Sequence, residues 1–195
     1  MAAEPFPGEP LLLIEPLDPG EHHRAGFSCG IARLDNYLKY TARKHHAGDF
    51  TRVWVATRAK QKEIVGFYAL NAHSLLGDQL PADLTRNAPL HGGIPAIYLS
   101  MIAVNRPDQG QGIGRFLLAD ALTRSVGAAD QIGLKTVVLD VIDDGGSKMT
   151  AKRVAFYGSM GFQTLPGYPT RMFIGIETIR RALSRSGKEN GRLGC

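Results

Sequence analysis

The sequence is poor in cysteine and in long apolar runs, and both shortages exclude classes of protein. Two cysteines, Cys29 and Cys195, occur in 195 residues, too few for a disulfide framework, so a reducing cytoplasm fits best. The longest nearly unbroken apolar run, 96–104, is far shorter than the roughly 20 residues of a membrane-spanning helix. The N-terminus lacks the basic start and apolar stretch of a secretory signal. We therefore expect a cytoplasmic protein without a membrane span.

The motifs of metal and nucleotide sites are also missing. The sequence holds no Cys-x-x-Cys and no His-Glu-x-x-His, and its paired histidines are adjacent in the chain, so we expect no structural metal. A glycine-rich stretch begins at Gly110, but Arg115 replaces the last glycine of a dinucleotide-binding fingerprint, and no Gly-Lys-Ser/Thr follows it. Neither a Rossmann site nor a Walker site is expected.

The composition is that of a soluble globular protein with a modest positive charge. Hydrophobic residues make 44% of the chain and charged residues 21%, and this length fits one domain. We expect that domain over 11–183, between a proline-rich disordered N-terminus at 1–10 and a disordered Ser/Gly-rich tail at 184–195. The formal net charge of +5 suggests an anionic partner.

Strand and helix patterns alternate along the chain, which favours an α/β fold. Strands are predicted at 11–14, 52–57, 63–72, 96–104, 135–142, 162–165 and 171–176, and helices at 31–46, from Gly112 or Gly114 onward, at 150–160 and at 177–183. The strands 52–57 and 63–72 are separated by a short polar turn, which predicts a β-hairpin.

The predicted helix 31–46 is amphipathic. Its apolar stripe recurs at helical spacing and comprises Leu34, Tyr37, Leu38, Thr41, Ala42 and His45. Basic residues gather on the outer face. A solvated helix face is the simplest interpretation of that pattern, and a surface for an anionic partner is the other.

Residues 109–115, Gln-Gly-Gln-Gly-Ile-Gly-Arg, follow a strand and open a helix. Glycine lets backbone amides approach an anion closely, and a helix N-terminus attracts negative charge. The segment therefore predicts a phosphate-binding loop. Its pattern, Gln109-x-x-Gly112-x-Gly114, resembles the acetyl-coenzyme A signature of the GCN5-related N-acetyltransferases (GNAT).

Two further segments carry this resemblance in the same chain order. The strand before the loop ends in Ile-Ala-Val at 102–104, and residues 151–162 repeat the family's second helix with its Gly-Phe stop. The resemblance implies a mixed, mostly antiparallel central sheet flanked by helices and splayed between its fourth and fifth strands. It implies acetyl-CoA as donor, held by Ile102, Ala103, Val104, Gln109, Gly110, Gln111, Gly112, Ile113, Gly114 and Arg115.

The resemblance also assigns an acid. Tyr157 matches the family's catalytic tyrosine, and a phenol with a pKa near 10 is protonated at pH 7 and able to protonate a leaving thiolate; a core tyrosine is the alternative interpretation. No residue stands out as the general base, and His73, Glu63 and Asp140 are candidates by residue type only. This suits an α-amine, about 10% neutral at pH 7, better than a lysine at roughly 0.04%.

A narrower resemblance concerns the start of the domain. Phe27-Ser28-Cys29-Gly30-x-x-x-Leu34-Asp35-x-Tyr37-Leu38 is similar to the opening helix of acetyltransferase toxins of bacterial toxin–antitoxin modules. That resemblance implies acetylation of aminoacyl-tRNA, a homodimer and a ribbon-helix-helix antitoxin. The connection at 143–149 departs from the group because it is longer than expected.

Under this hypothesis the basic helix face binds tRNA. Backbone phosphates require positive charge, and unpaired bases stack on aromatic rings. The candidates are Lys39, Arg43, Lys44 and Arg52, with Tyr40 as a possible stacking platform. Two other functions stay open: acetylation of a small-molecule amine or a protein N-terminus, and a non-enzymatic nucleic-acid-binding module whose glycine loop merely joins strand to helix.

Overall fold

The computed structural model describes residues 12–59, 61–77, 80–86, 88 and 92–192. The chain divides into two compact units: the first comprises 1–70, 101–121 and 183–195, and the second comprises 71–100 and 122–182. The expected N-terminal segment 1–10 lies outside the described residues, as do the last three residues of the expected tail. Within the described ranges, no helix is long and apolar enough to span a membrane.

Seven strands form one sheet in the order β1-β2-β3-β4-β5-β7-β6. Their bounds are β1 Leu12–Pro16, β2 Arg52–Arg58, β3 Ile64–Leu75, β4 Ile94–Val104, β5 Thr136–Asp140, β6 Gln163–Leu165 and β7 Tyr168–Gly175. The recorded pairs are antiparallel except that of β4 with β5, which is parallel. Each predicted strand is found, and the mixed, mostly antiparallel sheet that the GNAT resemblance implied is confirmed.

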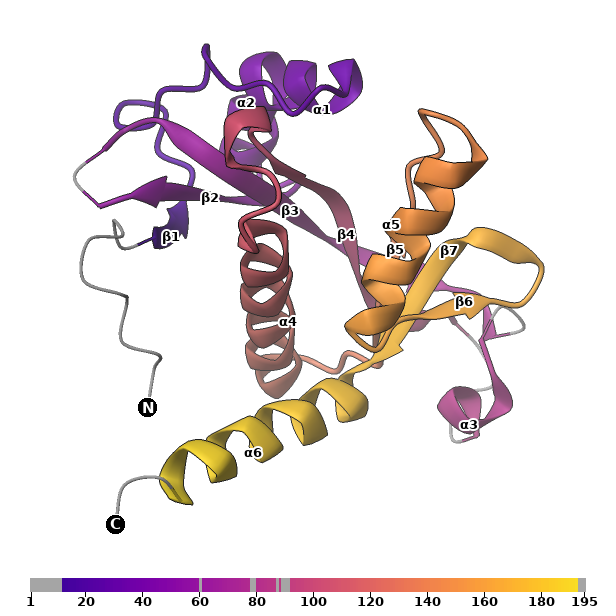
Figure 1. Ribbon diagram of the computed structural model, residues 1–195. Helices are drawn as coiled ribbons and strands as arrows, with labels where there is room; N and C mark the ends of the chain where they lie inside the picture. Colours follow the sequence, from indigo (N-terminus) through magenta and orange to yellow (C-terminus); the bar gives the residue numbers. More distant parts are fainter. Residues whose placement is uncertain (1–11, 60, 78–79, 87, 89–91, 193–195) are drawn as a thin grey trace. The chain divides into compact units, whose positions relative to one another are not determined.

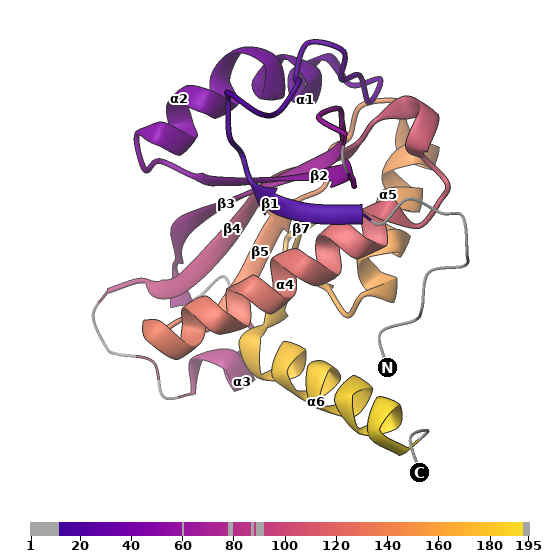
Figure 2. The same cartoon turned by 90° about the vertical axis from the view of Figure 1, so that its left-hand side faces the viewer.

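In the first unit, strand β3 separates two helical layers (Figure 2). On one face, the ring of Phe67 lies 5.4 Å from that of Phe27 and 6.2 Å from that of Tyr37. On the other face, a β-carbon at Gly66 would come within 2.7 Å of the Leu117 side chain in α4 (Ile113–Gln131). Glycine at this position lets the strand and the N-terminal end of α4 pack closely without displacing the Leu117 side chain.

The predicted helix 31–46 is interrupted. It consists of α1 (Ala32–Asn36), a π-helical turn η1 (Tyr37–Thr41) and α2 (Ala42–Ala47), lying beside β2 in Figure 1. Leu34, Leu38 and Ala42 are buried as expected, whereas His45 is exposed, so its place in the apolar stripe was wrong. A π turn holds more residues than an α turn, which rotates the following residues away from the α-helical phase.

In the second unit, apolar side chains of the sheet pack beneath the short helix α3 (Ala82–Thr85). This cluster comprises Leu75, Leu80, Ile94, Ala96, Val138, Leu165 and Phe173, with Leu84, Ala88 and Tyr98 against it. The parallel pairing of β4 with β5 runs from Ala96–Thr136 to Tyr98–Val138. Beyond it β4 continues to Val104 and β5 to Asp140, and the splay between these two strands stays a prediction.

Two helical boundaries differ from the predictions. Helix α5 spans Ser147–Ser159 and α6 spans Ile176–Arg192, so the unusually long connection at 143–149 contributes its last three residues to α5. Residues 184–192, expected in a disordered tail, continue α6. Ion pairs support α6 near its start, because Arg180 lies 2.6 Å from Asp130 and Arg181 pairs with Glu177 one turn earlier.

Candidate active site

The predicted phosphate-binding loop leads from a one-turn 3₁₀ helix, η3 (Arg106–Asp108), into α4. Gly110 and Gly112 both have φ of +81°, a backbone conformation that glycine adopts without steric cost. A β-carbon at either position would meet no atom within 4 Å. Both glycines are therefore needed for backbone conformation and not because neighbouring side chains crowd them.

Five consecutive backbone amides of this loop have no acceptor in the part of the chain that the structure describes. Among the hydrogen bonds of the described residues, none has the amide nitrogen of residues 110–114 as its donor. Glycines at positive φ followed by a helix start form an anion-binding concavity. The α4 dipole adds about 0.3–1 kcal/mol for an exposed anion. The loop thus has the geometry of an anion site, and its binding of the acetyl-CoA diphosphate by residues 109–115 stays a prediction.

Side chains brace the loop instead of pointing to a ligand. The Gln109 amide group donates to the carbonyls of Val104 and Cys29, each at 3.0 Å, and Gln111 donates to the carbonyl of Pro107 at 3.2 Å. In this arrangement Gln109 stiffens the loop. Arg115, on the first turn of α4, is exposed.

The turn before the loop is anchored by residues that the sequence analysis missed. Asp108 is 6% exposed, and its carboxylate accepts hydrogen bonds from Arg58 at 2.6 Å and from Asn105 at 3.1 Å. Asn105 in turn accepts from the amide of Ser28 at 3.0 Å. A buried ion pair with additional hydrogen bonds fixes geometry more than it adds stability. The only sequence signal was the Asn-Arg-Pro-Asp turn, whose partners lie far away in the chain.

Tyr157 lies near the C-terminal end of α5. Its ring packs edge-on against those of Phe156 and Phe162, with centroids 5.2 and 5.9 Å away. Burial raises the pKa of Tyr157 to about 12, against the opposing effect of the Arg153 guanidinium. Arg153 itself donates to the carbonyls of Ile142 and Asp144, both at 2.6 Å, so it ties α5 to the end of β5. The phenol is therefore a protonated donor at neutral pH.

Two of the three candidate bases lie together in the second unit. The ring of His73, on β3, lies 5.4 Å from that of Tyr98, on β4, and the Tyr98 hydroxyl donates to Asp140 at 2.9 Å. Arg171, on β7, donates twice to the same carboxylate, at 2.8 and 2.7 Å. These bonds, Arg171 first, hold the pKa of Asp140 below its usual range despite partial burial. Asp140 is thus an ionised, fully engaged carboxylate and a poor proton acceptor.

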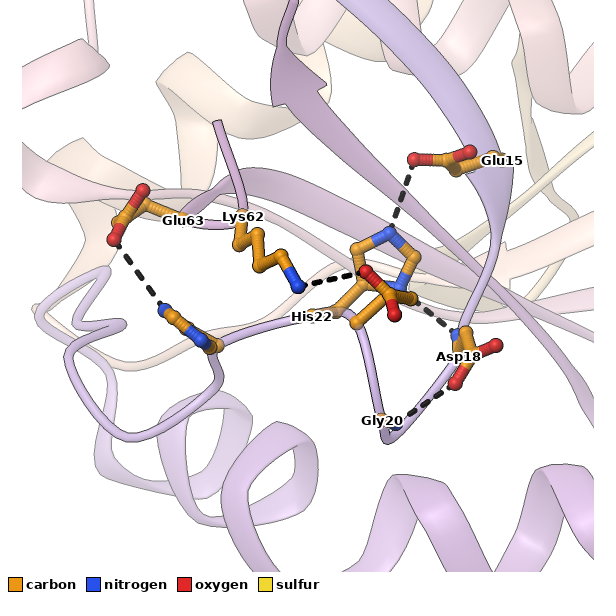
Figure 3. Close-up of polar contacts among 8 residues, drawn as sticks. Glu15, Asp18, Gly20, His22, Lys62 and Glu63 are labelled. Carbon is orange, nitrogen blue, oxygen red and sulfur yellow. Dashed lines mark hydrogen bonds and ion pairs between the residues drawn. The ribbon is translucent and has the colours of Figure 1, made fainter. Parts of the chain in front are cut away.

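Glu63, the third candidate, is exposed and belongs to a different cluster. Its carboxylate lies 3.4 Å from the His23 ring in the first unit, and Figure 3 marks this contact of Glu63 with a dashed line. Lys62, beside it in the chain, pairs with Glu21 at 2.8 Å, and the buried His22 ring bonds to Glu15. These contacts hold the loop after β1 against the β2–β3 turn, which is a structural role.

The candidate tRNA-binding residues lie on or next to the helical segment α1–α2. Arg43 and Lys44 are exposed and Lys39 is partly buried, whereas Arg52 is engaged by Asp49 at 2.6 Å and by the carbonyl of His46. Arg52 is thus less available to a phosphate than the sequence suggested.

Tyr40 projects from the π turn with 72% of its surface exposed. It lines two hollows, one of about 480 Å³ with Arg33 and one of about 320 Å³ with Arg24 and Lys39. The structure therefore places an exposed ring between basic side chains. Arg24 precedes the predicted helix by several residues and joins this surface only through the fold, so the sequence did not reveal it.

Comparison with known proteins agrees with these features. A family model described as an acetyltransferase (GNAT) domain matches residues 49–164, and the chain belongs to that family. It is 48% identical to a "probable toxin TacT" of Sinorhizobium fredii, over 86% of this chain and 93% of the relative. It is 35% identical to a "tRNA-acetylating toxin" of Mycobacterium tuberculosis, over 79% and 86%. A structure described as AtaT complexed with acetyl-methionyl-tRNAfMet shares the fold, with a TM-score of 0.77, 23% identity and coverage of 88% and 99%.

Proposed function

We propose that this protein is an acetyl-CoA-dependent N-acetyltransferase that acetylates the α-amino group of aminoacyl-tRNA and so blocks translation. The observation that carries the proposal is the loop at 110–114, whose five amides have no acceptor among the described residues. The relatives named as toxins, matched over most of their length, narrow the acceptor from amines in general to charged tRNA.

The donor supplies an acetyl group activated as a thioester. The amides of residues 110–114 bind its diphosphate, and the end of β4, from Ile102 to Val104, offers backbone groups to the pantetheine arm because β5 no longer pairs with β4 there. Tyr157 donates a hydrogen bond to the departing sulfur. With its pKa near 12, against about 8.5 for an ordinary thiol, the phenol stabilises the thiolate as a donor more readily than it transfers its proton outright.

The surface that binds the acceptor tRNA is assigned from the charge and exposure of its residues. Lys39, Arg43 and Lys44 neutralise phosphates of the tRNA backbone, while Tyr40 stacks on an unpaired base near the acceptor end. An aminoacyl ester lowers the basicity of its α-amine by electron withdrawal, so a larger fraction of this amine is neutral at pH 7 than of a lysine side chain. The substrate is therefore competent to attack the thioester at neutral pH.

Partners follow from the same assignment. An enzyme that blocks translation needs an inhibitor in the cell that makes it, and we propose a ribbon-helix-helix antitoxin for that role and a homodimer as the active species. Sedimentation of the purified chain, alone and with the product of an adjacent small reading frame, tests both.

Transfer of label measures the activity directly. Purified protein is incubated with acetyl-labelled acetyl-CoA and total charged tRNA, and label is followed into the RNA fraction. We expect label that mild alkali releases as N-acetylated amino acid, because the ester bond to the ribose is alkali-labile. Deacylated tRNA is the matched control and should stay unlabelled. Transfer to a small amine or a protein N-terminus, with none to charged tRNA, would favour the other acetyltransferase assignment.

A further inference from the structure

Polar side chains from four strands meet on one face of the sheet in the second unit. Tyr98 and Val138 are cross-strand partners, and Asp140 lies two residues beyond Val138, on the same face. Arg171 pairs with Asp140. The ring contact with Tyr98 brings His73 to this face. We call His73, Tyr98, Asp140 and Arg171 the polar row.

The polar row begins where the apolar core of the same face ends. Leu75, two residues after His73, and Val138, two before Asp140, belong to the buried cluster. His73 itself is only partly buried. Its imidazole thus lies at the border between core and surface, next to the Tyr98–Val138 pair of β4 with β5, and is partly exposed.

Tyr157 belongs to the helix on the opposite face. A β-carbon at Gly161, which ends α5, would lie 3.1 Å from the Ile174 side chain. Ile174 pairs with Val137 and Phe173 with Val138, so Ile174 and the polar row point to opposite sides because side chains alternate along a strand. Figure 1 shows α5 lying along β5 and β7 within this unit.

An amine that attacks a thioester has to lose a proton. The departing sulfur needs a group that donates a hydrogen bond or a proton to it. The attacking nitrogen and the leaving sulfur are bonded to the carbonyl carbon on different sides. We therefore expect the general base and the general acid on opposite sides of that carbon. We propose that His73 is the general base of the reaction, accepting the proton of the α-amine on the face opposite Tyr157. This inference rests on the proposed function and deepens it.

The step balances with the groups named. The amine nitrogen forms the N–C bond, the C–S bond breaks, and one amine proton passes to the His73 imidazole. The sulfur, hydrogen-bonded by Tyr157, ends as the thiol by taking a proton from the phenol or from solvent. Return of the imidazolium proton to water, or through water to the phenolate, restores the resting enzyme.

The rest of the polar row positions the base. Asp140 is ionised, and Arg171 holds both of its carboxylate oxygens. The Tyr98 hydroxyl bonds to the same carboxylate and its ring contacts the imidazole. The titratable and charged groups facing His73 from neighbouring strands are thus Tyr98 on β4, Asp140 on β5 and Arg171 on β7.

The pH dependence of the wild-type enzyme is the first test. The proposal requires both the substrate amine and the His73 imidazole to be neutral, so log kcat/KM with charged tRNA should rise on the acid side of neutrality with a limiting slope of two. Aminoacyl esters survive this range long enough for initial rates. A slope of one in the wild-type enzyme would overturn the proposal even if no variant were made.

His73→Gln is the second test. We expect kcat/KM at pH 7 to fall about 100-fold or more and the slope to become one, since only the amine then titrates. Stabilisation of the variant by acetyl-CoA, measured as a shift in Tm, should equal that of the wild-type protein. His73→Asn provides the same measurement if the glutamine variant fails to fold.

His23→Gln is the matched control, because His23 is exposed and pairs with Glu63 in the first unit; its rate and slope should match the wild-type values. A His73→Gln enzyme that keeps a slope of two refutes His73 as the base while leaving the acetyltransferase assignment intact. If wild-type protein acetylates no charged tRNA, the proposed function itself fails. The two failures are therefore distinguishable.

Discussion

The phosphate-binding loop of the first unit and the polar row of the second are built from different parts of the chain. In the loop, the groups offered to a ligand are five consecutive backbone amides, presented by two glycines at positive φ. In the polar row, it is the His73 side chain, which lies among side chains of three other strands that come from up to about a hundred residues away in the sequence. A site made of backbone amides is formed by residues that are consecutive in the sequence. A site made of side chains depends on which strands pair and in what register.

This difference predicts different responses to substitution. Replacing a side chain in the second unit should remove chemistry while leaving coenzyme affinity intact. Distorting the backbone of the loop should remove coenzyme affinity without directly altering the chemical groups. Substitutions on the charged helix face should weaken only the binding of the tRNA substrate.

The largest effect is expected from Tyr157→Phe, which removes the hydroxyl and keeps the ring packing against Phe156 and Phe162. We expect kcat to fall about 100- to 10,000-fold, because the leaving thiolate loses its donor. The Kd for acetyl-CoA, measured by calorimetry, should change less than about twofold, since the hydroxyl makes no contact with the diphosphate loop in this assignment. Unchanged kcat would remove Tyr157 from the chemistry.

Reversal of the basic helix face should have the next largest effect. Lys39→Glu, Arg43→Glu and Lys44→Glu together should lower kcat/KM for charged tRNA about 100-fold, and the remaining activity should depend less steeply on salt because fewer counterions are released. Initial rates across a salt series measure both quantities.

A second triple variant, with the same change in net charge on exposed cations elsewhere, separates local binding from overall charge. Its substitutions are Lys148→Glu, Lys152→Glu and Arg181→Glu. We expect a much smaller loss of activity. Equal losses in the two triple variants would argue against a defined tRNA-binding face.

Gly112→Val tests the loop itself. A β-branched residue is strained at φ of +81°, so the backbone should shift and the amides should lose their common direction. We expect acetyl-CoA to bind about 10- to 100-fold more weakly by calorimetry. Gly127→Ala, in the interior of α4 where a β-carbon meets nothing within 4 Å, should bind the coenzyme normally and gain up to about 1 kcal/mol of stability. Wild-type affinity in Gly112→Val would mean that the loop does not hold the diphosphate.

The smallest effect concerns the stability of the polar row. The Arg171 guanidinium lowers the pKa of Asp140, so the carboxylate stabilises the native state at pH values above its unfolded pKa of about 4. That contribution, about 1 kcal/mol for a partly exposed pair, should disappear as the pH falls through the lower native pKa. Urea unfolding from pH 7 to pH 3 should show Asp140→Asn less stable than wild type at pH 7, with the difference shrinking at pH 3. Asp143→Asn, an exposed neighbour, is the control.

Much of the fold could be predicted from the sequence, because its signals are local. Alternation of side chains gave the strands, and the glycine pattern gave the loop before α4. The π turn at Tyr37–Thr41 was hidden, because its residues continue an α-helical pattern and only packing against β2 and β3 reveals the extra residue in the turn. The exposed position of His45 follows from that turn.

The candidate site also has a part that could be predicted from the sequence and a part that could not. The sequence by itself determined the conformation of the glycine loop, because positive φ at Gly110 and Gly112 is a property of single residues, whereas phosphate binding there and the role of Tyr157, which the resemblance assigned, stay predictions. Only the tertiary structure decided that Gln109 braces the loop, that Arg52 is engaged by Asp49, and that His73 rather than Glu63 lies beside Asp140. These outcomes depend on which strands become neighbours and in what register, and pairings across such distances in the chain leave no local pattern to read.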